Sequence, residues 1–155
     1  MPIKEKYIGY FLAFSLSIIV LYLLSKQIKE RHLQDDPMLH LLKDAILPLQ
    51  PFFDRNYPSA NIDLERLKLY RGEKSYTINK NQIFLCLYDD DDEYYPFNAL
   101  LYVLLHELAH KANTEDIGHT EKFHIAFENI LDESHRLGIY NPNIPMIKDY
   151  CGGDE

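Results

Sequence analysis

The chain carries a short segment, HELAH, whose residue types and spacing could bind a metal and move a proton. Its two histidines, His106 and His110, are four residues apart, so on a helix they lie one turn apart on the same face and can bind one Zn²⁺. Glu107 lies about 100° further around the helix, where it can reach a water on the metal without being a ligand. The zinc lowers the pKa of that water, and the glutamate accepts its proton as general base and later delivers it to the leaving amine.

The surroundings of the motif favour a real zinc site over an accidental match. Three residues at set positions recur by chance in large sets of sequences, and such matches usually lie on exposed helices or loops. Here the motif lies in residues 99–112, the most apolar helix predicted for the soluble part. A helix that is apolar on nearly every face is buried. Burying two histidines and a glutamate there costs free energy unless they have a partner such as a metal.

A catalytic zinc site of this kind needs a third protein ligand from further along the chain. The metzincin pattern requires Gly at position 113 and His at position 116, whereas this chain has Asn113 and Asp116, so that class is excluded. A thermolysin-like site would use a glutamate on a following helix. Glu128, 18 residues after His110, could fill that role.

His119 is the second candidate for the third ligand. It lies nine residues after His110 and directly follows Gly118, just before a predicted helix. A loop of this length can turn back and present the imidazole to the metal. Two further histidines, His124 and His135, lie within that helix and are expected to face solvent.

The elements expected to position these residues form an α+β domain. An earlier helix should begin at Asp36-Pro37, an N-cap followed by proline in the first turn, and should end at Pro48 and Pro51. Apolar and alternating runs predict strands, and capping and stop residues predict two more helices. The predicted strands are 64–70, 76–78 and 82–88; the predicted helices are 99–112, capped by Asn98, and 121–137, capped by Thr120 and ended by Gly138. The acidic run 89–93 is expected to be a solvated loop.

The N-terminal region has the pattern of a membrane anchor. Residues 7–24 contain no charge, and as a helix they would rise about 27 Å, close to the hydrocarbon thickness of a bilayer. A cleaved signal peptide would need a small-x-small site after this run, and none is present. A buried core helix fits poorly with the charged linker that follows. We expect an uncleaved single-pass anchor over 1–25, a juxtamembrane linker over 26–36 and the folded domain over 37–155, with the side of the membrane undetermined because basic residues flank both ends.

Charge and cysteine content limit the kinds of binding partner and crosslink that we expect. The formal net charge is −8, and the basic residues are scattered along the chain. Nucleic-acid binding usually leaves a basic stripe, so DNA and RNA are not expected as partners. The two cysteines, Cys86 and Cys151, are too few for a disulfide framework. One bridge between them can form, but two unpaired thiols is the favoured interpretation.

The segment HELAH, a short loop and then GHTEKF resembles the pattern of the SprT and WLM group of zinc metallopeptidases. In that group HExxH is followed by a histidine four residues before a phenylalanine, and His119 and Phe123 match this spacing. The resemblance covers about residues 77–137. It implies a minimal zincin-like fold with zinc ligands His106, His110 and His119 and with Glu107 as the catalytic residue.

The resemblance also predicts which strand borders the substrate-binding cleft. In zincins the strand before the active-site helix forms the edge of the cleft, where substrate pairs as an added strand, and that role would fall to residues 81–88. The closing segment offers Tyr140 or Tyr150 for stabilising an oxyanion, although tyrosines that pack the tail are the favoured interpretation. The chain lacks the DNA-binding and zinc-ribbon extensions of DNA-repair members, so cleavage of DNA-crosslinked proteins is not implied. Compact, anchored forms like this one resemble proteins of large DNA viruses.

These observations together predict a membrane-anchored zinc metallopeptidase that acts on a protein or peptide substrate. The alternative is a membrane-tethered binding or scaffold module whose zinc site is structural or vestigial. Glu107 favours the enzyme, because a structural site has no use for a general base. A fourth protein ligand on the zinc would favour the binding module.

Overall fold

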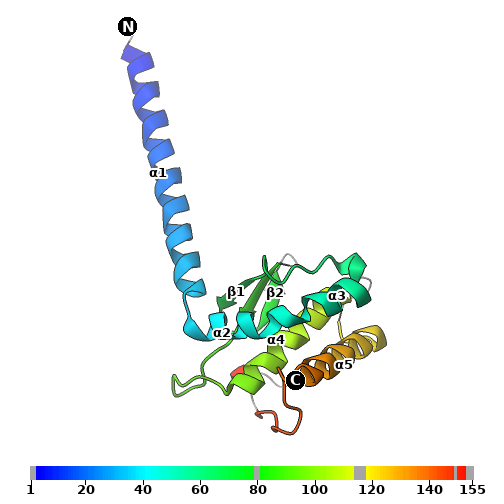
Figure 1. The fold of residues 1–155 in the computed structure, drawn as a ribbon. Helices are drawn as coiled ribbons and strands as arrows, with labels where there is room; N and C mark the ends of the chain where they lie inside the picture. The colour runs from blue at the N-terminus through cyan, green and yellow to red at the C-terminus, as the bar shows by residue number, and fades with distance from the viewer. Residues whose placement is uncertain (1–2, 79–80, 114–117, 149, 153–155) are drawn as a thin grey trace. The chain divides into compact units, whose positions relative to one another are not determined.

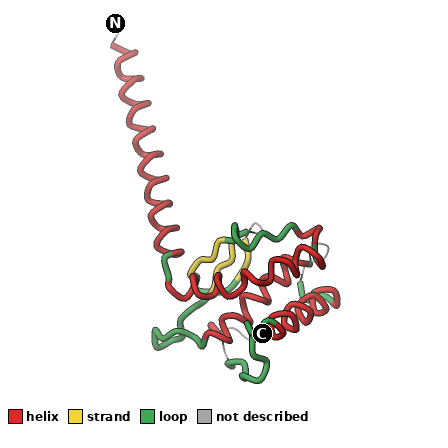
Figure 2. Tube along the Cα trace, viewed as in Figure 1, coloured by secondary structure: helices red, strands yellow, loops and turns green. Residues whose placement is uncertain are grey.

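The computed structural model of the protein describes residues 3–78, 81–113, 118–148 and 150–152. It divides the chain into two compact units, Met1–Asp35 and Asp36–Glu155. The second unit combines helices with a small three-stranded sheet, which confirms the α+β class (Figure 2).

The first unit is a single long helix, α1 (Ile3–Gln34). Its segment Tyr7–Arg31 has a mean hydropathy of 2.1, none of it is buried, and it is long and apolar enough to cross a membrane. Signal sequences and core helices can share this length and composition. The hydroxyls of Ser17 and Ser25 donate to the carbonyls of Ala13 and Tyr22 at 2.9 and 2.8 Å, so these polar groups are satisfied within the helix. The predicted linker continues the same helix as far as Gln34.

The second unit begins with the helix expected at Asp36-Pro37. In α2 (Pro37–Ile46) the Asp36 carboxylate accepts from the Met38 N–H at 2.9 Å, which confirms the predicted cap. The helix ends before Pro48, as expected. The prediction that Pro51 ends a helix is wrong. Pro51 lies in the first turn of α3 (Gln50–Asn56), where a missing N–H removes no helical hydrogen bond. A short 3₁₀ turn, η1 (Leu47–Leu49), joins the two helices, and η2 (Pro58–Ala60) follows them.

The sheet contains β1 (Lys68–Arg71), β2 (Tyr76–Ile78) and β3 (Gln82–Leu85) in the order β1-β3-β2. β3 runs parallel to β1 and antiparallel to β2. The strand predicted over 76–78 is confirmed, whereas those predicted over 64–70 and 82–88 are each shorter in the structure. The mostly exposed acidic run 89–93 forms a loop, which the Tyr88–Tyr94 bridge closes.

The predicted role of residues 81–88 as the edge of the cleft is wrong. β3 is the central strand and has a hydrogen-bonded neighbour on each side, so it cannot accept an added strand. The reason is that strand order in the sheet differs from order along the chain. Among the described strands, β2 is the edge strand next to the helix that carries HELAH, because Thr77 bonds to that helix.

The core forms around α4 (Phe97–Ala112), which Figure 1 shows between α2 with the sheet on one side and α5 (Glu121–Arg136) on the other. The α4 side chains that are fully buried are Leu100, Leu101, Leu104, Leu105, Leu108 and Ala109. The predicted cap by Thr120 is confirmed, since its hydroxyl accepts from the Phe123 N–H at 3.4 Å. Gly138 follows the C-cap residue of α5 and has a φ of 72°, the left-handed conformation that commonly ends a helix, so the predicted stop is confirmed.

Asn98 does not cap α4, contrary to prediction. The helix begins one residue earlier, at Phe97, and Pro96 occupies the N-cap position. The Asn98 side chain instead pairs with the backbone of Asn141, accepting from its N–H at 2.9 Å and donating to its carbonyl at 3.1 Å. This pair ties the segment after α5 to the start of α4.

The C-terminal segment is joined covalently to the residue that directly follows β3. A disulfide links Cys86 to Cys151, in η3 (Tyr150–Gly152), so the interpretation of two unpaired thiols is wrong. The Cα atoms are 6.3 Å apart although the residues are 65 positions apart in sequence. Tyr150 strengthens this junction by donating its hydroxyl to the Cys86 carbonyl at 2.5 Å.

Reduction of the disulfide in the full-length protein should lower the free energy of unfolding by about 4 kcal/mol. In the chain-entropy model this is the effect of releasing a loop closed between residues 65 apart. Urea unfolding in detergent micelles, with and without a phosphine reductant, measures the difference. A Cys86→Ala/Cys151→Ala variant is the control and should not respond to the reductant. Equal midpoints for the oxidised and reduced protein would contradict the prediction.

Candidate metal centre

Three imidazoles from two segments of the chain converge on one point. His106 and His110 lie on α4, and His119 lies just before α5. The Nε2 atom of His106 is 3.1 Å from Nε2 of His110 and 3.1 Å from Nε2 of His119. The ligand atoms of all three lie within 4.8 Å of one another, so this group could hold a metal ion.

The nitrogen spacing fits tetrahedral coordination. Zinc–nitrogen bonds of about 2.0–2.1 Å in tetrahedral geometry separate neighbouring nitrogens by about 3.3 Å. The two measured separations of 3.1 Å are close to this value. Hydrogen bonding alone explains the cluster less well, because each imidazole nitrogen can share only one proton at a time.

Phe123 provides the apolar floor of this three-histidine group. It is 1% exposed, and its ring centroid lies 4.3 Å from that of His110, 4.9 Å from that of His119 and 5.0 Å from that of His106. The spacing of four residues between His119 and Phe123 therefore has a physical reason. The phenyl ring sits one turn into α5, where it packs against α4 and holds the segment with His119 beside the other two imidazoles.

Electrostatics favour the protonation state that binds metal. Burial, followed by the neighbouring imidazoles of His110, His119 and His124, lowers the pKa of His106 to about 4. The ring is therefore neutral at physiological pH. A neutral imidazole has the lone pair that a metal ligand requires.

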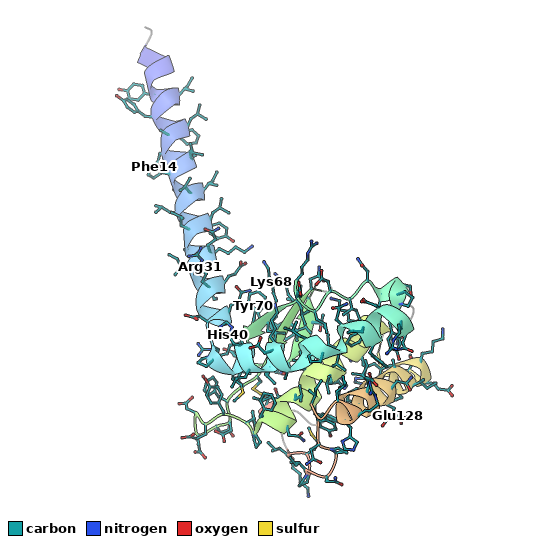
Figure 3. The ribbon with its side chains drawn as sticks, viewed as in Figure 1. Phe14, Arg31, His40, Lys68, Tyr70 and Glu128 are labelled. Carbon is teal, nitrogen blue, oxygen red and sulfur yellow. A yellow bond between two sulfur atoms is a disulfide. The ribbon has the colours of Figure 1, made fainter. Side chains whose placement is uncertain are left out.

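The other sequence candidates lie outside this group. Glu128 is exposed on α5 (Figure 3), and the metal-binding group found among the described residues does not include it. His124 and His135 are exposed, as predicted. Of the two candidates for the third ligand, the structure brings His119 to the other two histidines.

Glu107 faces a different side of α4 from the two histidines. It is 7% exposed, and its Oε2 accepts a hydrogen bond from Thr77 Oγ1, on β2, at 2.6 Å. One turn further along, the buried Lys111 donates to the Asn81 side chain at 3.1 Å. The histidine pair of α4 thus points toward α5, while the adjacent pair of charged residues points toward the sheet.

Thr77 is a site residue that sequence reasoning missed. The only available signal was its central place in the short predicted strand 76–78, where alternation puts it on the opposite face from its neighbours. Strand alternation does not say which helix that face covers, so the contact with Glu107 needed the structure.

The two tail tyrosines are packed, as favoured from the sequence. Tyr140 is 7% exposed and lies against Tyr102, with ring centroids 6.0 Å apart. The Tyr150 hydroxyl is 2.9 Å from Ser75 Oγ and also donates to the Cys86 carbonyl. Burial is the main cause that raises the pKa of Tyr150 to about 12, and the charge of Glu107 adds to it.

Replacing His119 with Ala in the full-length protein should weaken Zn²⁺ binding by at least about 100-fold, since outer-shell partners alone contribute 10–100-fold. Glu128→Ala should leave binding unchanged, because that side chain is exposed and outside the group. Competition with a chromophoric chelator in detergent micelles measures both. A larger loss for Glu128→Ala than for His119→Ala would restore the thermolysin-like site.

The metal-free protein should lose stability as the pH falls from about 6.5 to 4. The pKa of His106 is about 4 in the folded protein against 6.5 in the unfolded chain, so protonation favours unfolding. The stabilisation is complete above pH 6.5 and is at most about 3 kcal/mol, reduced by solvent because the ring is only partly buried. Thermal unfolding in EDTA at stepped pH measures it. His106→Phe should flatten the profile, and an unchanged profile would contradict the assignment.

Comparisons with known proteins find relatives of this chain, but the relatives have no assigned activity. No protein-family model matches the chain, and no solved structure matches it. Uncharacterized protein 136R of Invertebrate iridescent virus 6 is 45% identical over 91 residues, which are 57% of this chain and 51% of that protein. Uncharacterized protein 042R of Invertebrate iridescent virus 3 is 40% identical over 105 residues, 67% of this chain and 62% of that protein. The chain thus spans about half to three fifths of these viral relatives, and their names assign no function.

Proposed function

We propose that the protein is a zinc-dependent metallopeptidase that is anchored in a membrane by α1. One observation carries the proposal: three imidazole nitrogens converge, and α4, the helix that supplies two of them, also carries a buried glutamate directly after His106. The three nitrogens supply a metal site, and the glutamate supplies a base that a purely structural site would not need.

The choice of zinc is supported by the donor set and its spacing. Neutral imidazoles suit zinc among the divalent metals, and three protein ligands are typical of catalytic zinc sites. A zinc ion held by His106, His110 and His119 would act as a Lewis acid that polarises a carbonyl and lowers the pKa of a water. Structural zinc sites usually have four protein ligands, whereas the described part of the chain brings together three, which favours the enzyme over the scaffold module.

Glu107 is the residue that would move the proton. It follows His106 directly on α4, and it does not belong to the group of three ligands. As the water oxygen attacks the peptide carbonyl carbon, one water O–H bond breaks and the carboxylate accepts the proton. The same proton passes to the amine nitrogen when the C–N bond breaks.

The edge strand β2 is the proposed place for the substrate backbone. An extended peptide can pair with an exposed strand edge through backbone hydrogen bonds. This pairing aligns the peptide carbonyls and depends little on most of the peptide side chains. Thr77 joins β2 to the base, so a peptide on this edge would lie beside Glu107. A small sheet with an antiparallel edge strand, followed by the active-site helix and a second helix, supports the proposed zincin-like fold and the resemblance to the SprT and WLM group.

Glu107→Gln in the full-length protein should retain zinc and abolish cleavage of labelled casein, because the amide keeps the size of the side chain but cannot accept the proton. Zinc content and cleavage are measured on the same preparation in detergent micelles. The matched control is Glu128→Gln, the same change on an exposed position of α5, which should cleave at the wild-type rate. Cleavage by Glu107→Gln at the wild-type rate would refute the role of the glutamate.

A further inference from the structure

A short hydrogen bond connects the base to the edge of the sheet. Thr77 Oγ1 donates to Glu107 Oε2 at 2.6 Å, across 30 positions of sequence. An ionised carboxylate can only accept, so the hydroxyl is the donor. The distance lies in the range of about 2.5–2.7 Å that is typical of an O–H group bonded to a charged oxygen.

Both ends of this hydrogen bond are held by regular structure. Glu107 lies within α4 between buried residues, including Leu105 and Leu108, which are fully buried. Thr77 pairs with the fully buried Ile83 across the antiparallel ladder. A β-branched side chain has restricted χ1 rotation, so the backbone of β2 sets where its hydroxyl lies.

Among the described residues, the Asp36 carboxylate also accepts from hydroxyl groups, but its role is different. The hydroxyls of Tyr88 and Tyr94 donate to Asp36 at 2.9 and 3.1 Å. That carboxylate also caps α2, so it stabilises the backbone of a helix end. Glu107 lies in the interior of α4, where the backbone groups are already paired, and its carboxylate accepts from a side chain on the sheet.

We propose that Thr77 is a positioning residue for Glu107. The inference rests on the proposed function, in which Glu107 is the general base. By donating to Oε2, Thr77 fixes the rotation of the carboxylate and keeps its own proton throughout. The carboxylate has further lone pairs to accept the proton of the attacking water. Because Thr77 lies on β2, the strand proposed to pair with substrate is also the strand that orients the base.

Three variants of the full-length protein test this role through activity on labelled casein. Thr77→Val keeps the shape but removes the donor, and it should lower kcat by about 10–100-fold with little change in KM or zinc content. Thr77→Ser keeps the donor and should recover most of that loss. The matched control is Tyr94→Phe, which removes a hydroxyl bonded to a different carboxylate and should leave kcat unchanged.

A second measurement does not depend on metal or activity. In EDTA, the melting temperatures of Thr77→Val, Glu107→Ala and the double variant form a double-mutant cycle. If the two side chains interact as the structure has them, the double variant should lose less than the sum of the two single losses.

The outcomes separate this inference from the function on which it rests. If the wild-type protein does not cleave casein, the proposed function fails and the positioning role fails with it. If Glu107→Gln is inactive while Thr77→Val matches the wild type, only the positioning role is overturned. Additive melting losses, loss of zinc in Thr77→Val, or a Thr77→Ser variant as slow as Thr77→Val would also overturn it.

Discussion

The packing of Phe123 between α4 and α5 is the contact on which the three-histidine group depends. Burying a phenylalanine side chain contributes about 1.5–3 kcal/mol. Here that gain also holds His119 beside two residues that lie on another helix. A hydrogen bond from the Asn113 amide to the Thr120 hydroxyl, at 3.4 Å, also joins the end of α4 to the start of α5. The apolar contact of Phe123 thus brings three polar ligands together.

The burial of α4 sets a second constraint, because the helix also carries two charged residues with little exposure. Glu107 and Lys111 are 7% and 4% exposed. A buried charge without a partner costs several kcal/mol. The sheet supplies Thr77 for one and Asn81, just before β3, for the other. Burial lowers the pKa of Lys111, and its bond to Asn81 offsets part of the cost of keeping it in the core.

Sequence reasoning succeeded where the signal is local and failed where it depends on pairing between distant segments. The caps by Asp36 and Thr120 and the spacing of the histidines follow from the geometry of one helix turn. The position of β3 in the centre of the sheet does not, because alternation along a strand says nothing about its neighbours. The bond of Asn98 to Asn141 shows the same limit: a residue type suited to capping was used instead for a contact 43 residues away.

The disulfide between Cys86 and Cys151 makes the final fold depend on the redox conditions around the protein. Such bonds form and persist in oxidising surroundings and are rare where cellular thiols keep cysteines reduced. A newly made chain in a reducing environment would therefore have Tyr150 held to Ser75, Cys86 and Tyr95 by hydrogen bonds and packing alone. The redox state of the surroundings is thus part of the maturation of this fold, and a preparation kept in thiol reductant is a different molecule from the one described.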